Sequence, residues 1–170
     1  MDLRQHIRNI PDFPKPGILF RDVTTLVQNP EAFRYAIQSM AERFESVEVD
    51  AIAGIDARGF MFAAPLALRL DVPLVIIRKR GKLPFDTYSQ SYDLEYGTDS
   101  LEIHVDAVSD GDRVLLVDDL LATGGSLSTA AALVERTGGI VAGICVAIEL
   151  SELRGRNALA PHRTESLVTY

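Results

Sequence analysis

Cysteine, tryptophan and long apolar segments are nearly or wholly missing from this sequence. The single thiol, Cys145, cannot form a disulfide within the chain, and its place in the apolar stretch 143–148 predicts a small buried side chain rather than a nucleophile. No apolar stretch approaches the roughly 20 residues of a membrane-spanning helix, and the first residues lack the charged-then-apolar pattern of a secretory signal. These absences predict a protein of the reducing cytoplasm with no membrane partner.

Positive charge is also scarce, because 17 Lys and Arg residues face 24 Asp and Glu residues and leave a net charge of −7. This balance disfavours a surface built for a nucleic acid backbone, so no nucleic acid partner is expected. The chain has no Gly-x-x-x-x-Gly-Lys-Ser/Thr motif and no Gly-x-Gly-x-x-Gly after a strand, which disfavours nucleotide hydrolysis and dinucleotide binding. The spacing of His6, His104 and His162 does not suggest a metal site.

The chain does contain an alternation of apolar strands and helices over 170 residues, a length that suits one domain. Strands are predicted at 51–55, 73–77, 114–117 and 140–148, and helices at 30–44, 60–70 and 127–137. The alternation predicts an α/β fold with a mostly parallel sheet flanked by helices. The helix at 60–70 is apolar nearly all round and should be well buried. The polar residues 81–100 are predicted to form a hairpin or lid, with strands at 92–96 and 101–105.

The most informative stretch follows the predicted strand at 114–117. Asp118 and Asp119 come directly after its apolar residues, and a Thr/Gly/Gly/Ser loop at 123–126 then opens a helix. Ligands of open α/β sheets bind outside the carboxyl ends of the strands, and a helix N-terminus binds phosphate through its backbone N–H groups. Since two adjacent carboxylates can accept hydrogen bonds from two adjacent hydroxyls, the stretch predicts a site for a ribose 5-phosphate.

An ordinary strand-turn-helix is the alternative interpretation of this stretch, with Thr123 or Ser126 as the N-cap of the helix. The doubled aspartate favours the functional interpretation, because two like charges at the end of a buried strand resist burial unless a ligand or cation compensates them.

Two further polar clusters follow predicted strands. Asp56-Ala57-Arg58-Gly59 follows the strand at 51–55, and Arg78-Lys79-Arg80-Gly81-Lys82 follows the strand at 73–77. Because neighbouring parallel strands end at one crevice, both clusters are expected near Asp118. The basic cluster is either a solvated loop, a nucleic-acid or targeting patch, or a clamp that stabilises a diphosphate leaving group.

The stretch 117–126 resembles the phosphoribosyl-diphosphate-binding motif of the type I phosphoribosyltransferases. The resemblance implies that Asp118 and Asp119 hold the ribose hydroxyls. It implies that the 5-phosphate lies in the loop formed by Ala122, Thr123, Gly124, Gly125 and Ser126. In that family the turn at 56–59 binds pyrophosphate and often contains a non-proline cis peptide. The residues implied for the diphosphate are Arg58, Gly59, Arg78, Lys79, Lys82 and Tyr96.

The segment 13–22 resembles the N-terminal signature of the adenine-specific members of this family. Further matches at 56–59, 78–84, 94–97, 117–125 and 149–150 extend the resemblance over residues 13 to about 161, although 85–91 is not matched closely and 161–165 is more polar than the aromatic-rich tail of the family. The resemblance implies a hood at about 1–30, a core at 31–150 with a flexible lid at about 80–97, and a C-terminal segment at 151–170. It places adenine near Leu19, Phe20, Arg21 and Leu150.

The implied reaction joins adenine to 5-phosphoribosyl 1-diphosphate and gives AMP and diphosphate, a step of purine salvage. Glu95 is the implied general acid or base, with Arg58 and Lys82 assisting the leaving group. Mg²⁺ would be bound mainly through the substrate, and the chain would form a homodimer. Three alternatives stay open: the same chemistry on hypoxanthine, guanine or uracil; a regulator that senses phosphoribosyl diphosphate and binds nucleic acid; and a nucleotide-binding oxidoreductase.

Overall fold

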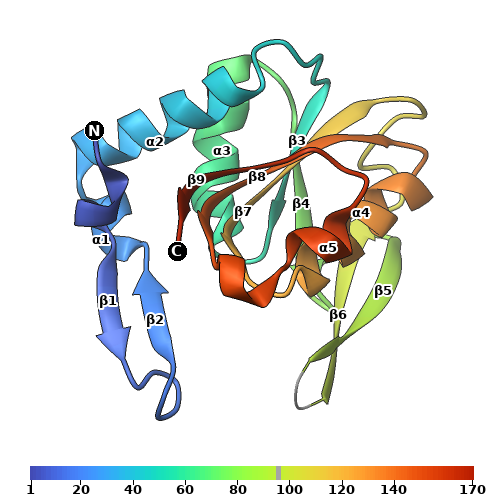
Figure 1. Ribbon diagram of the computed structural model, residues 1–170. Helices are drawn as coiled ribbons and strands as arrows, with labels where there is room; N and C mark the ends of the chain where they lie inside the picture. The colour runs from blue at the N-terminus through green and yellow to red at the C-terminus, as the bar shows by residue number, and fades with distance from the viewer. Residues whose placement is uncertain (95–96) are drawn as a thin grey trace.

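The computed structural model describes residues 1–94 and 97–170 and confirms the predicted α/β fold. Within these residues, one sheet of seven strands has the order β5-β6-β4-β3-β7-β8-β9 (Figure 1). The strands are β3 (Ala51–Ile55), β4 (Leu74–Lys79), β5 (Thr87–Leu94), β6 (Gly97–His104), β7 (Arg113–Leu121), β8 (Ile140–Glu149) and β9 (Thr164–Thr169). The sheet is mostly parallel, because only the pairings of β6 with β4 and with β5 are antiparallel.

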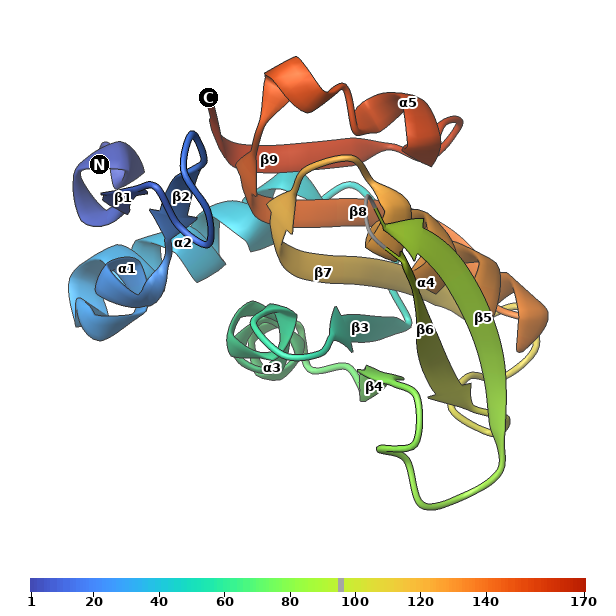
Figure 2. The same cartoon turned by 90° about the horizontal axis from the view of Figure 1, so that it is seen from below.

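Helices cover both faces of the sheet (Figure 2). The helical elements are η1 (Leu3–His6), α1 (Thr24–Gln28), α2 (Pro30–Arg43), α3 (Gly59–Leu70), α4 (Gly125–Arg136), η2 (Ser151–Leu153) and α5 (Arg156–Leu159). The start of α2 has the predicted cap: Asn29 Oδ1 accepts hydrogen bonds from the N–H groups of Glu31 and Ala32, and Pro30 is the first helical residue. No helix in the described part of the chain is long and apolar enough to cross a membrane.

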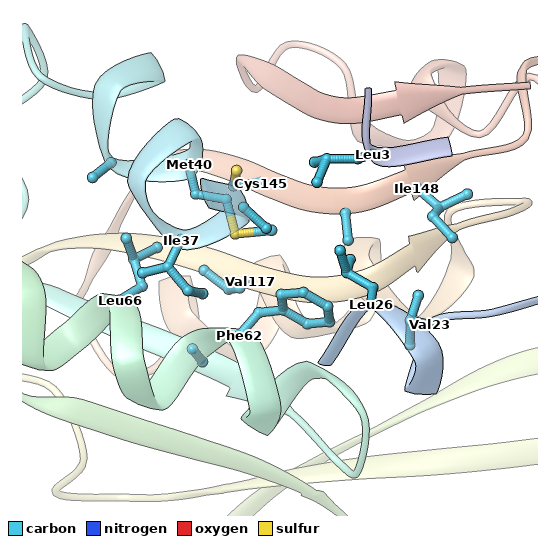
Figure 3. Close-up of a cluster of buried hydrophobic side chains, with 14 of the residues drawn as sticks. Leu3, Val23, Leu26, Ile37, Met40, Phe62, Leu66, Val117, Cys145 and Ile148 are labelled. Atoms are coloured by element: carbon cyan, nitrogen blue, oxygen red, sulfur yellow. The ribbon is translucent and has the colours of Figure 1, made fainter. Parts of the chain in front are cut away.

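Two apolar layers hold the helices against the sheet. On one face, Met40 of α2 and Phe62 of α3 pack against Val117 and Cys145 of the central strands (Figure 3). On the other face, α4 and α5 pack against the alternate side chains of the same strands. Full burial raises the pKa of the Cys145 thiol to about 12, so this residue is the predicted small buried side chain and has little thiolate at neutral pH.

Two hairpins extend from the same side of the molecule (Figure 1). The first is formed by β1 (Arg8–Pro11) and β2 (Leu19–Asp22), which pair antiparallel outside the main sheet. The second is formed by β5 and β6. No strand pairing was predicted for the first hairpin, because the pairing of 8–11 with 19–22 leaves no periodic signal in such short strands.

Several sequence predictions were wrong in detail. The helix α3 is not buried all round, because Leu68 is 85% exposed. The strand predicted at 114–117 continues as β7 to Leu121, so Asp118 and Asp119 lie within a strand rather than after it. The strands β5 and β6 start earlier than the strands predicted at 92–96 and 101–105, and residues 95–96 of the first prediction lie outside the described residues. The strand β9 was not predicted because its residues are largely polar.

Candidate active site

A cavity of about 420 Å³ opens at the carboxyl ends of β3 and β7. Two strand-to-helix turns form most of its wall, one leading from β3 into α3 and the other from β7 into α4. Its lining residues are Ile55, Asp56, Ala57, Arg58, Lys79, Tyr92, Leu101, Asp118, Asp119, Leu120, Ala122, Thr123, Gly124, Gly125, Ser126 and Leu127. The structure therefore brings the predicted turn at 56–59 and the motif at 118–126 into one cavity, as expected for neighbouring parallel strands.

The loop before α4 contributes backbone rather than side-chain groups. Gly124 is the N-cap of α4, has a φ of +87°, and no side chain caps the helix. The alternative in which Thr123 or Ser126 caps this helix is therefore wrong. Because the first N–H groups of a helix have no partner within the helix, this loop is suited to bind an anion such as a phosphate.

Asp118 and Asp119 are both buried at the floor of the cavity. The backbone N–H of Asp119 donates to Asp118 Oδ1 (2.8 Å), and Arg58 Nε donates to Asp119 Oδ2 (2.5 Å). Burial and the neighbouring Asp119 charge raise the pKa of the Asp118 carboxyl well above its usual range. The adjacent acceptors match the donors of a vicinal diol.

The turn from β3 into α3 carries a different kind of carboxylate. Asp56 Oδ2 accepts hydrogen bonds from Arg78 Nε and Lys82 Nζ, each at 3.2 Å. Burial raises the pKa of Asp56, but the hydrogen bonds from Lys82 and Arg78 and the backbone of Lys79 bring it below its usual range. The Asp56–Ala57 peptide bond is cis, as the family resemblance implied.

Gly59 completes this turn by allowing a close approach to β7. A Cβ atom at position 59 would lie 2.9 Å from both Asp118 Oδ1 and the Val117 carbonyl oxygen. Gly59 is buried and does not line the cavity. Its role is to let the turn at 56–59 pack closely against β7.

The predicted cations divide into two groups. Lys79 lines the cavity beside Tyr92 and Arg58, and its Nζ is 2.9 Å from Asp99 Oδ2. Arg78 and Lys82 do not line the cavity and bind Asp56 instead. The predicted Glu95 and Tyr96 lie outside the residues that the structure describes.

The hood residues approach the cavity at Arg58. The Arg58 guanidinium lies 5.6 Å from the centre of the Phe20 ring, and Phe20 packs edge-to-face on Phe13. Arg21 stacks on Tyr170 instead, at 3.7 Å from its ring centre. Leu19 is 46% exposed, and Leu150 packs against the apolar layer under α2 and α3. Phe20 is thus the predicted adenine residue that the structure joins directly to a cavity residue.

Seven cavity residues were not predicted as site residues: Ile55, Asp56, Ala57, Tyr92, Leu101, Leu120 and Leu127. Asp56 was quoted only as part of its turn, although a carboxylate that ends a strand next to a basic cluster was a usable signal for its ion pairs. Tyr92 and Leu101 come from β5 and β6, whose pairing with the rest of the sheet had no sequence signal.

Comparisons with known proteins agree with this geometry. The chain matches the phosphoribosyl transferase domain family over residues 22–164. It is 53% identical over 168 residues to the adenine phosphoribosyltransferase of Maridesulfovibrio salexigens, covering 99% of both chains. The crystal structure of adenine phosphoribosyltransferase from Thermoanaerobacter pseudethanolicus superposes with a TM-score of 0.97 at 51% identity, covering 99% of this chain and 98% of that one.

A more distant relative is similar over the same length. The adenine phosphoribosyltransferase of Saccharomyces cerevisiae, solved in complex with adenine and an imino-altritol bisphosphate, is 37% identical. Its TM-score is 0.92, and the match covers 98% of this chain and 96% of the other.

Proposed function

The chain belongs to the phosphoribosyl transferase family, and within it to the adenine phosphoribosyltransferases; from that premise we propose how its cavity carries out the reaction. The reaction breaks the bond between ribose C1 and the diphosphate oxygen of phosphoribosyl diphosphate and forms a bond from C1 to adenine. AMP and diphosphate are released, which is a salvage route to AMP. The identity of 51–53% to adenine phosphoribosyltransferases over 168–170 residues carries this assignment.

The ribose 5-phosphate half of the substrate binds along β7 and the start of α4. The backbone N–H groups of residues 122–126 hold the phosphate, where the uncapped helix end offers unpaired donors. Asp118 and Asp119 accept the hydrogen bonds of the two ribose hydroxyls. Because both carboxylates are buried, these bonds form in a low-dielectric site and fix the orientation of C1.

The diphosphate half binds where the cations gather. Arg58 exchanges its hydrogen bond with Asp119 for one with the diphosphate, and Lys79 reaches the same group from β4. Arg78 and Lys82, held on Asp56, add positive charge around the turn at 56–59, which includes Gly59. These charges stabilise the leaving group as negative charge develops on it.

Adenine binds under the hood at about residues 1–30. Phe20 provides an apolar ring beside Arg58, and Leu19, Arg21 and Leu150 complete the base site. The lid at about 80–97, which carries Tyr96, closes over the reacting bond and excludes water that would compete for C1.

Glu95 is proposed as the acid or base that handles the adenine ring proton. The test is Glu95→Gln, which keeps the size of the side chain and removes its ionisation. We expect a fall in kcat with a small change in KM for phosphoribosyl diphosphate. Unchanged turnover in a folded variant would assign the proton transfer to another group.

Mg²⁺ fits this site as a partner of the substrate rather than of the protein. The described residues contain no group of three His, Cys, Asp or Glu side chains placed to hold a metal ion. Mg²⁺ keeps several waters and suits diphosphate and hydroxyl oxygens. Bound with the substrate it would neutralise the diphosphate, and Asp118 and Asp119 would accept hydrogen bonds from its waters.

The partner proposed for the protein is a second copy of this chain in the cytoplasm. Three apolar side chains are exposed: Leu68 on α3, and Leu74 and Ile76 on β4. Leu74 and Ile76 pair in register with Ile52 and Gly54 of β3. Sedimentation velocity tests this proposal; we expect a dimer at micromolar concentration that Leu68→Glu weakens, and a monomer at all concentrations would contradict it.

The assay that tests the function offers the protein phosphoribosyl diphosphate, Mg²⁺ and one base at a time: adenine, hypoxanthine, guanine, xanthine or uracil. We expect AMP formation, with the other bases slower by about a hundredfold or more. Turnover of another base would keep the ribose-phosphate site and discard the adenine site. Binding of phosphoribosyl diphosphate without turnover of any base would place the protein among sensors.

A further inference from the structure

The loop at 122–126, proposed to bind the 5-phosphate, packs against the segment that contains α5. Its N-cap, Gly124, adopts a φ of +87° without any side-chain cap. A Cβ atom at Gly124 would lie 2.6 Å from the carbonyl oxygen of Gly155 and 3.1 Å from the Ala158 Cβ atom. The loop backbone therefore rests directly on the segment that contains α5.

The contact is reciprocal and leaves no space on either side. A Cβ atom at Gly155 would lie 2.3 Å from the Ala122 carbonyl oxygen and 2.7 Å from the Leu121 Cδ1 atom. Two backbone segments thus pack against each other at glycines, one from each segment. Any shift of Gly155 is transmitted to Ala122 and Gly124, which line the cavity.

The segment at 155–159 needs an anchor of its own, because α5 is a single turn and such a helix is not stable alone. Arg156 supplies the anchor: its Nε donates to Glu149 Oε1 and its Nη2 to Glu149 Oε2, both at 2.7 Å. Arg156 also donates to the Thr164 carbonyl oxygen, and Ser166 Oγ donates to Glu149 Oε2.

The anchor connects to the cavity through the sheet. Glu149 ends β8 and pairs in register with Leu121, the residue that precedes the phosphate loop. The carboxylate of Glu149 is buried, and the hydrogen bonds from Arg156 hold its pKa below the usual range. Glu149 is buried, whereas the Arg156 side chain is 47% exposed, and the two-point geometry of the pair fixes Gly155, one residue away.

Resting on the proposed function, we propose that Arg156 is a positioning residue for the phosphate loop. Its ion pair with Glu149 holds Gly155 against Ala122 and Gly124, which keeps the loop N–H groups aimed at the 5-phosphate. Arg156 does not line the cavity and acts only through this contact.

The first test is Arg156→Lys, which keeps the charge but loses the two-point geometry. The expected result is a rise of about tenfold in KM for phosphoribosyl diphosphate, with kcat and KM for adenine within about twofold of wild type. The matched control is Arg113→Lys. Arg113 lies at the opposite end of β7 and donates to Asp50 Oδ2 through Nε (2.9 Å) and to Asp50 Oδ1 through Nη2 (3.3 Å), so the control removes the same kind of ion pair far from the loop.

A second variant, Gly155→Ala, keeps the ion pair and disturbs only the contact. We expect the same selective rise in KM for phosphoribosyl diphosphate, because the added Cβ atom would displace the Ala122 carbonyl. If Arg156→Lys lowers the thermal midpoint as Arg113→Lys does and leaves every KM unchanged, the ion pair stabilises the fold alone and the proposal is overturned. An equal rise in both KM values overturns it as well.

The proposal can fail separately from the proposed function. Titration calorimetry measures the affinity for ribose 5-phosphate, which depends on the loop and does not require turnover of adenine. We expect Arg156→Lys to weaken this binding by about tenfold and Arg113→Lys to leave it unchanged. Wild-type protein that binds ribose 5-phosphate but turns over no adenine would refute the adenine assignment while the comparison of the two variants still decides the role of Arg156.

Discussion

Two carboxylates lie near the carboxyl ends of the neighbouring parallel strands β3 and β7, Asp56 just after β3 and Asp118 within the last part of β7, and their surroundings differ. Asp56 is neutralised by Arg78 and Lys82, and its pKa lies below the usual range. Asp118 in β7 is buried beside another carboxylate, and its pKa is raised well above the usual range. The compensated carboxylate holds two cations, whereas the uncompensated one is the acceptor that we propose for the ribose hydroxyls. Carboxylates at similar positions in the sheet thus differ in their proposed roles: Asp56 fixes cations, and Asp118 binds substrate.

The largest effect that tests this contrast is expected from Asp118→Asn. We predict a fall of about a hundredfold in kcat/KM for phosphoribosyl diphosphate, because a hydrogen bond to a buried charged acceptor is replaced by a weaker neutral one. Asn retains the oxygen that accepts the Asp119 N–H. Initial rates measure the effect, with the exposed Asp106→Asn as control. Wild-type kinetics in the variant would remove Asp118 from the ribose site.

A smaller loss of activity is expected from Asp56→Asn. The substitution leaves Arg78 and Lys82 with a neutral partner, so both cations become less fixed beside the diphosphate. We predict a fall of about tenfold in kcat/KM and a loss of about 1 kcal/mol in the free energy of unfolding. Kinetics and urea unfolding measure the two effects. A loss as large as that of Asp118→Asn would show that the two carboxylates do not differ in role.

The two carboxylates should also differ in the sign of their pH dependence. Asp118 has a raised pKa in the folded state, so its contribution to stability falls as pH rises above the ordinary value of 3.8. Asp56 has a lowered pKa, so its contribution is present above 3.8 and is lost as pH falls through the folded-state value. At pH 7 we therefore predict that Asp118→Asn raises the free energy of unfolding by about 1 kcal/mol, while Asp56→Asn lowers it.

Unfolding measured from pH 3 to pH 8 checks these signs. The difference between wild type and Asp118→Asn should grow with pH, and the gap for Asp56→Asn should close as pH falls. Parallel curves for all three proteins would contradict the contrast.

The smallest effect is expected at Asp99, which pairs with Lys79 at the edge of the cavity. Asp99→Asn frees Lys79, whose pKa the Asp99 carboxylate raises in the wild type. Since the pair is half-exposed and screened, we predict a change of about twofold in KM for phosphoribosyl diphosphate. The salt dependence of KM measures it, and a change above tenfold would place Asp99 among the residues that organise the diphosphate site.

The sequence predicted what is local and missed what is not. The strand at 51–55 and the cap at Asn29 agree with the structure because their signals lie within a few residues. The order of strand, Gly-rich loop and helix around residues 114–137 was predicted for the same reason and agrees with β7 and α4. The pairing of Asp56 with Arg78 and Lys82, the packing of Gly155 on Gly124, and the strand β9 depend on contacts between distant segments. No window of sequence carries these contacts, so only the folded structure reveals them.

The burial of Cys145 also has a practical consequence for spectroscopy. A thiol with no exposed surface and a pKa of about 12 does not react with maleimide dyes in the folded protein. Because the sequence has no tryptophan, its intrinsic fluorescence comes from tyrosine alone. A single cysteine introduced at Phe13, which is 50% exposed on the hood hairpin, would therefore be the sole labelled position. Because no other residue would carry the dye, its fluorescence would report hood movement during turnover.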